Sequence, residues 1–269
     1  MIAPSLRLSV GLLTAVPVPV PADPTERQWR RAMLLAPVTG AALGGIAAGL
    51  LLLGRLWADT DTTSADGNLL PCVVAVGALA LLTRGLHLDG LADTVDGLGA
   101  AAKGGPARAL EVMRRGDVGP FGVVAVVLVL LLQVAALHVD VNNHTGTVAI
   151  VMAATASRWA ACLACVARPA RPDGLGRLVL GRVGPVAAGL TGLGVAVFGL
   201  WVAALDPHTI APTAESFAAL AAAPAAALVT GLLVHRWRRA FGGMTGDTLG
   251  ATVEIVQTVV LLVFVGVHR

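Results

Sequence analysis

The sequence predicts an all-α protein: a polytopic membrane helical bundle of about seven transmembrane helices, preceded by an N-terminal interfacial or re-entrant segment. Hydrophobic residues make up 56% of the 269 residues, and the mean hydropathy is +0.81. Charged residues make up only 13%, whereas about 25% is usual for a soluble domain. Several apolar stretches are also long enough to cross a hydrocarbon layer about 30 Å thick. Together these observations exclude an ordinary soluble domain.

The expected spans are apolar stretches of about 20 residues, because an α-helix rises about 1.5 Å per residue. The second is interrupted, since its continuous apolar part stops at Thr83. No soluble segment separates the spans, so residues 1–269 are expected to form a single integral-membrane domain. We place the spans at residues 34–53, 69–88, 118–139, 147–167, 183–205, 213–234 and 251–267.

The segment before the first span contains an apolar run broken by Pro17, Pro19 and Pro21. Proline lacks the backbone N–H that a helix interior needs. We therefore expect a short interfacial or re-entrant helix there rather than a further span.

Lysine and arginine residues alternate between the connections. Sixteen of the nineteen lie in the N-terminal segment or in the connections around 84–117, 168–182 and 235–250, whereas residues 54–68, 140–146 and 206–212 contribute only Arg55. Cytoplasmic loops carry such an excess. We therefore expect the N-terminus and these connections on the cytoplasmic side of a bacterial inner membrane, with membrane lipid as a partner. Topology explains the pI of 9.2, so nucleic acid is not an expected partner.

The stretch "GLHLDGLADTVDG" at residues 85–97 carries three aspartates at the membrane boundary. If it is helical, Asp89, Asp93 and Asp96 fall within an arc of about 60°. One interpretation is a solvated acidic face balanced by nearby cations. The other is a Mg²⁺ site, because this ion takes carboxylate, water and phosphate oxygens as ligands. Ionisable groups near a membrane core are usually functional, which favours the second interpretation.

Further candidates flank this stretch. His87 would titrate near pH 6.5 and could act as an acid or base, although a continuous helix would turn it about 160° away from Asp89. In "LEVMRRGDVGPFG", Arg114 and Arg115 could clamp phosphate oxygens, and Asp117 could bind metal or cap the next helix.

Two candidates lie within or beside later spans. Arg158 is the basic residue well inside an apolar stretch, and either a structural ion pair or a ligand contact would explain it. In "FGGMTGDTLGATVEI", a glycine-rich turn leads into an apolar helix that contains Glu254. Such a turn offers backbone N–H groups to phosphate, and Asp247 could add a metal ligand. A simple capped turn is the alternative.

The segments "GLHLDGLADTVDGLGA", "EVMRRGDVGPFGV", "SRWA", "ARPDGLG" and "GGMTGDTLGATVEI", in this order, resemble the adenosylcobinamide-GDP ribazoletransferase family, the cobalamin synthases. The resemblance runs from "LTAVPVP" to the last span. It implies a Mg²⁺-dependent transferase of cobalamin biosynthesis. Such an enzyme joins a corrinoid, adenosylcobinamide-GDP, to α-ribazole or α-ribazole 5′-phosphate and releases GMP.

The resemblance also implies roles for individual residues. Asp89, Asp93 and Asp96 match the acidic motif of the family, and Gln257 departs from it where a second glutamate is common. The expected catalytic residues are Asp89, Asp93, Asp96 and Asp247, and the same four with Asp117 are the expected metal ligands. The expected substrate contacts are His87, Lys103, Arg114, Arg115, Arg158, Thr245, Gly246 and Glu254.

Two other functions remain open from the residues alone. A CDP-alcohol phosphotransferase would need a longer aspartate pattern than this chain has. A cation-coupled transporter would place its acids near the bilayer midplane within inverted repeats. A homo-oligomer, or association with other membrane-bound enzymes of cobalamin assembly, is a further expectation.

Overall fold

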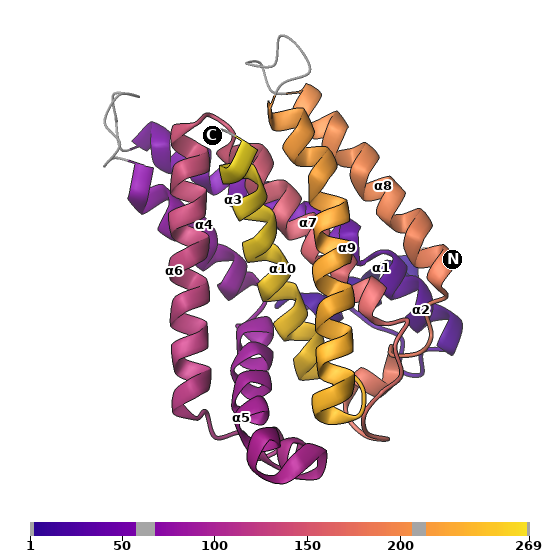
Figure 1. Cartoon of the computed structure of the whole chain (residues 1–269). Coiled ribbons are helices and arrows are strands. Elements are labelled where there is room, and N and C mark those ends of the chain that lie inside the picture. The colour runs from indigo at the N-terminus through magenta and orange to yellow at the C-terminus, as the bar shows by residue number, and fades with distance from the viewer. Residues whose placement is uncertain (1–2, 58–67, 206–213, 268–269) are drawn as a thin grey trace.

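The computed structural model describes residues 3–57, 68–205 and 214–267, and helices dominate these ranges (Figure 1). The only bridge of β type within them joins Pro169 to Met244. The predicted all-α class is therefore confirmed. The elements are α1 (Ala3–Leu13), α2 (Glu26–Leu34), α3 (Ala36–Trp57), α4 (Leu69–Leu82), α5 (Leu86–Val112), α6 (Pro120–Asn142), α7 (Gly146–Ala164), the short 3₁₀ helix η2 (Leu175–Leu178), α8 (Pro185–Ala204), α9 (Ala214–Phe241) and α10 (Gly246–Val267).

Six of these helices are long and apolar enough to cross a membrane, namely α3, α6, α7, α8, α9 and α10. Helices α4 and α5 would add a seventh span only as a bent pair, with an angle of 84° between them. The prediction of about seven spans is thus confirmed as six or seven.

The second expected span, 69–88, is wrong as one continuous helix. Helix α4 ends at Leu82 after 14 residues, which cover about 21 Å at the usual rise. Arg84 and Gly85 then adopt left-handed backbone angles, with φ of 54° and 67°, and these end the helix. The segment expected as a loop from residue 84 is mostly α5, which bends at Gly105 just before Pro106.

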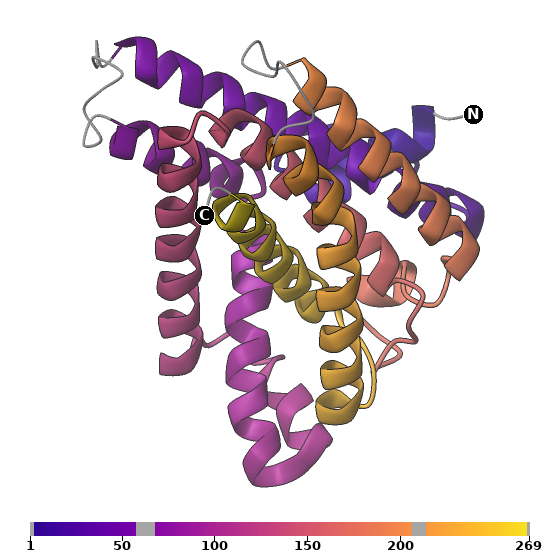
Figure 2. The same cartoon turned by 45° about the horizontal axis from the view of Figure 1, so that its top comes forward.

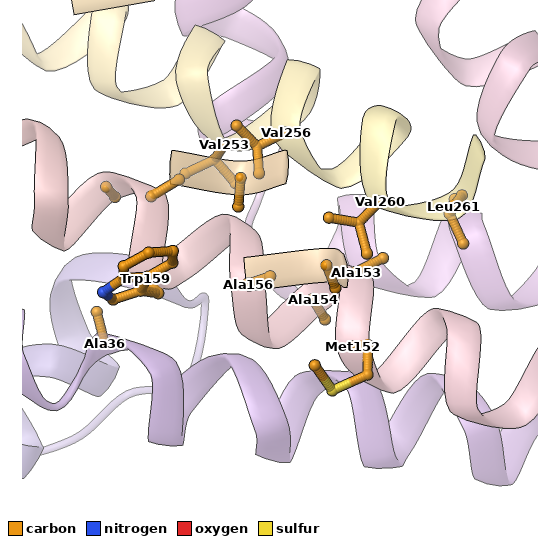
Figure 3. Close-up of a cluster of buried hydrophobic side chains, with 14 of the residues drawn as sticks. Ala36, Met152, Ala153, Ala154, Ala156, Trp159, Val253, Val256, Val260 and Leu261 are labelled. Atoms are coloured by element: carbon orange, nitrogen blue, oxygen red, sulfur yellow. The ribbon is translucent and has the colours of Figure 1, made fainter. Parts of the chain in front are cut away.

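Helix α7 forms the centre of the bundle and packs against α3, α10, α9 and α8. Gly40 and Gly44 of α3 lie directly on its backbone, because a Cβ added at Gly44 would lie 2.8 Å from the Cα of Val151. Figure 3 shows the small residues of α7, such as Ala153 and Ala156, facing the valines of α10. Small residues allow this close approach of membrane helices.

The two N-terminal helices flank the bundle, and at 11 and 9 residues both are too short to cross a membrane. Two hydrogen bonds fix α1 in place. One joins Ser9 Oγ and Thr39 Oγ1 of α3 (3.0 Å), and in the other the backbone N–H of Ala15 donates to the carbonyl of Leu82 (2.6 Å). The predicted short N-terminal helix is therefore confirmed.

One end of the bundle gathers elements that are far apart in the sequence. The beginnings of α6 and α10 and the end of α9 lie around α5 in both views (Figures 1 and 2). Helix α5 packs against all three. The aspartates of α5 therefore meet the glycine-rich turn that precedes α10.

Candidate active site

Helix α5 carries the acidic stripe, and a glycine on the same helix brings it against α10. A Cβ added at Gly90 would lie 2.6 Å from the carbonyl oxygen of Asp247 and 3.0 Å from its Cα. Any larger side chain at this position would hold the two helices apart. The contact places Asp247 beside Asp89 and Asp93, although more than 150 residues separate them in the sequence.

The charges of these acids act on one another. Asp93 is half-buried. It lies on α5, which is not one of the six helices that are long and apolar enough to cross a membrane by themselves. Burial and the negative charges of Asp89, Asp247 and Asp96 raise the pKa of Asp93 to about 6, and Arg171 opposes this effect. The site therefore holds an excess of negative charge that a cation would relieve.

Arg171 was not predicted as a site residue, because its charge was explained by topology alone. A short backbone pairing positions it: the N–H of Ala170 donates to the carbonyl of Met244 (2.7 Å), and the N–H of Met244 donates to that of Arg168 (3.0 Å). Arg171 Nη2 then lies 3.3 Å from Asp247 Oδ2. Its Nη1 is buried and has no hydrogen-bond partner among the described residues. The sequence feature that could have indicated this residue is the turn-forming segment "ARPDGLG" between two spans, which contains Arg171.

The start of α10 is a capped turn. The N–H of Thr248 donates to Thr245 Oγ1 (3.2 Å), and the N–H of Thr245 donates to Thr248 Oγ1 (2.8 Å). Thr245 Oγ1 also lies 3.3 Å from Asp247 Oδ2. Gly246 lies against η2, since a Cβ on Gly176 would come within 2.7 Å of its nitrogen. The capped turn considered from the sequence is present, and it orients Asp247.

Two neighbouring cavities open at this site. The smaller, of about 170 Å³, is lined by Asp89, Asp247, Arg171 and His87 together with apolar side chains. The larger, of about 500 Å³, lies between the N-terminal helices and the beginning of α5, and Asp89 lines it as well. His87 was expected to face away from Asp89. Both side chains nevertheless line the smaller cavity, because this cavity lies against the first turn of α5. The buried Nδ1 of His87 has no partner in the described part of the chain.

Asp96 is engaged by the backbone of α6. Its carboxylate accepts the N–H of Gly119 (2.7 Å) and the N–H of Gly122 (3.0 Å), so it caps that helix. Asp117, the residue considered for this cap, is exposed in the preceding connection. Neither aspartate lines the two cavities. Their roles as metal ligands stay predictions.

The other predicted cations lie on the surface. Arg114 pairs with Asp173 at 3.1 Å and Arg115 with Glu111 at 2.5 Å, and all four side chains are at least half exposed. Lys103 is also exposed. None of the three predicted cations lines either cavity.

Arg158 and Glu254 belong to a buried network within the bundle. Arg158 Nη1 donates to Gln257 Oε1 (2.7 Å), and Gln257 Nε2 donates to Gln133 Oε1 (3.1 Å). Gln133 Nε2 then donates to Glu254 Oε2 (2.9 Å). Each of the four side chains is at most 5% exposed. This arrangement favours the structural interpretation of Arg158.

The acids at the cavity match Mg²⁺ in chemistry. In residues 3–57, 68–205 and 214–267, no three acidic, histidine or cysteine side chains lie together closely enough to hold a metal ion by themselves. Mg²⁺ in proteins usually takes one or two carboxylates and completes its octahedron with water and substrate phosphate. Asp89 and Asp247, beside the crowded Asp93, fit this donor chemistry.

Comparisons with known proteins identify the family of this chain. Residues 5–265 match the model of the family described as cobalamin-5-phosphate synthase. A protein of Frankia casuarinae, named adenosylcobinamide-GDP ribazoletransferase, is 44% identical over 96% of this chain and 92% of its own length. A protein of Nocardioides sp. with the same name is 40% identical over 95% of this chain and 96% of its own length. No solved structure matches the chain. The chain belongs to the cobalamin-5-phosphate synthase family.

Proposed function

We propose that this chain is an adenosylcobinamide-GDP ribazoletransferase. It would join adenosylcobinamide-GDP to α-ribazole, or to α-ribazole 5′-phosphate, and release GMP. The observation that carries the proposal is the convergence of Asp89, Asp247 and Arg171 at one cavity, beside Asp93, in a member of this family. A transporter would need its acids near the middle of the spans, whereas Asp247 lies in the first turn of α10.

The reaction moves one phosphoryl linkage. The ribose 3′-hydroxyl of the acceptor attacks the phosphorus next to the corrinoid, an O–P bond forms, and the bond to GMP breaks. The hydroxyl proton passes to a carboxylate of the site, which acts as a general base. Arg171 Nη1, a buried donor without a partner in the described chain, would bind an oxygen of the diphosphate.

Asp89 and Asp247, beside Asp93, would hold Mg²⁺ together with water and substrate phosphate, and the bound ion would supply positive charge to the diphosphate and to the leaving GMP. The raised pKa of Asp93 supports this proposal, because a cation would offset the mutual repulsion of the acids.

We further propose that the site faces the cytoplasm from the inner membrane. The connections at 113–119, 165–184 and 242–245 lie at the end of the bundle where α10 begins (Figure 1), and Asp247 is in the first turn of that helix. Those connections and the adjoining helix ends carry most of the arginines, as expected of the cytoplasmic side.

The test is a reconstituted reaction. Purified protein in detergent is incubated with adenosylcobinamide-GDP and α-ribazole, with Mg²⁺ or with EDTA, and the corrinoid product and GMP are measured. Product is expected only with Mg²⁺, and Asp89→Asn and Asp247→Asn are each expected to lower kcat by roughly 10²-fold or more. The control is Glu26→Gln, the same chemical change at an exposed acid that lines neither cavity. Absence of product, or full activity in both aspartate variants, would refute the proposal.

A further inference from the structure

The two cavities meet at Asp89 but differ in their linings. Asp89 lines both, together with Leu12, Leu86 and Leu175. The smaller cavity adds the charged Arg171 and Asp247. The larger adds mainly apolar groups, which are Leu8, Gly11, Val20 and Trp29. Two compartments that share Asp89 suit a reaction between two substrates.

Both threonine hydroxyls of the larger cavity are engaged within the protein, and the exposed Arg84 makes one such bond. Thr14 Oγ1 donates to the carbonyl of Val10 (2.8 Å), and Thr83 Oγ1 donates to that of Leu79 (3.0 Å). Arg84 Nη2 donates to the carbonyl of Ala15 (3.3 Å). A ligand rich in hydrogen-bonding groups would leave its own groups unpaired there, which costs about 1–3 kcal/mol for each buried group. An apolar, aromatic ligand suits this cavity best.

The substrates of the proposed reaction differ in this respect. Guanine presents a polar edge of donors and acceptors, and the corrin ring carries amide side chains around its rim. The benzimidazole base of α-ribazole has methyl groups and no exocyclic hydrogen-bonding group. A cavity of about 500 Å³ is also in the usual range for binding a small molecule of this kind.

We propose, on the basis of the function proposed above, that the larger cavity binds the base of α-ribazole, so that its ribose 3′-hydroxyl lies at Asp89, while the smaller cavity takes the diphosphate of the donor. Helices α1 and α2 become walls of the acceptor site, held there by the contact of Ala15 with Leu82.

A crossed kinetic experiment tests this division. Trp29→Ala should raise the KM for α-ribazole about tenfold or more and change the KM for adenosylcobinamide-GDP less than about twofold, because lost apolar contact weakens only the ligand it touches. Arg171→Ala should do the reverse. The matched control is Trp201→Ala, which removes an exposed tryptophan of α8 that lines neither cavity and should change neither constant.

A filling variant tests the same cavity without removing a wall. A Cβ on Gly11 would lie 3.1 Å from Val20 Cγ1, so the side chain of Gly11→Val would fill part of the larger cavity. It should lower kcat/KM for α-ribazole about tenfold relative to the riboside of unsubstituted benzimidazole. A change in the KM for the donor with Trp29→Ala, or no change in either acceptor constant with both variants, would overturn the proposal.

Equilibrium binding of α-ribazole alone separates this proposal from the proposed function. Binding that Trp29→Ala or Gly11→Val weakens, in a protein that makes no product, would support the cavity and refute the activity. If the protein forms product but neither substitution changes the binding of α-ribazole, the larger cavity is not the acceptor site, whereas the proposed activity is supported.

Discussion

Two polar regions in this apolar bundle are built in opposite ways. At the beginnings of α5 and α10, Asp89, Asp93 and Asp247 crowd together, Asp89 lines two cavities, and the buried Arg171 Nη1 has no partner among the described residues. Around Arg158, the polar side chains bind one another in a chain and line neither cavity. The two regions therefore differ in whether their charged groups reach a cavity that a ligand can enter.

The physical difference is one of pairing. A buried charge is tolerated when partners surround it, and side chains from α6, α7 and α10 supply such partners around Arg158. Only the Nε of Arg158 is buried without a hydrogen-bond partner among the described residues. The acid cluster keeps like charges together, which is unfavourable unless a cation or a substrate binds. The network fixes how three helices pack, and the cluster keeps its charges available for binding.

The largest effect on stability is expected for Arg158→Met. This substitution leaves Glu254 buried without its neighbouring positive charge and removes the donor to Gln257, so it should lower the free energy of unfolding by about 3–5 kcal/mol. Unfolding in mixed detergent measures the change, and kcat per folded molecule should be retained. The double variant Arg158→Met/Glu254→Gln should recover part of the loss. Unchanged stability with a lost kcat would instead make Arg158 a ligand contact.

Gly90→Ala should affect the acid cluster next most strongly. The new Cβ would overlap the backbone of Asp247, so α5 and α10 must separate, at a cost of about 1–3 kcal/mol. Because small displacements of reacting groups are costly, kcat should fall by roughly 10²-fold. Gly77→Ala in α4 is the control, since its Cβ would meet nothing within 4 Å. Equal kcat in the two variants would show that the contact does not position the acids.

The sequence predicted most of the fold, because helices of about 20 apolar residues have a strong signal. It missed the end of α4 at Leu82, which depends on left-handed angles at Arg84 and Gly85 and leaves the apolar run short of a span. It placed Asp89, Asp93 and Asp247 among the site residues, but it did not find Arg171. That residue reaches the site only through the backbone pairing of residues 168–170 with Met244, a long-range contact without local periodicity.

The two roles of the acidic stripe can be separated at Asp96. Asp96→Ala removes the cap of α6 and should lower the free energy of unfolding by about 1 kcal/mol. Asp96→Asn keeps an acceptor oxygen for one of the two N–H groups and should retain most of the stability and activity. The same change at Asp89 should abolish most activity without a loss of stability. An inactive but stable Asp96→Asn protein would show that Asp96 acts in the chemistry.

The smallest effect is expected for Gln257→Glu, which introduces the second acid that the family resemblance of the sequence implies at this position. The new carboxylate would accept a charge-assisted bond from Arg158 Nη1 but could no longer donate to Gln133 Oε1. It would also place a second acid near Glu254, so the gains and losses should cancel to within about 1 kcal/mol of unfolding free energy. Thermal unfolding and steady-state kinetics on the same preparation measure both consequences. If kcat changes tenfold while stability holds, the network around Arg158 communicates with the acid cluster through α10, and the two regions cannot be treated as independent.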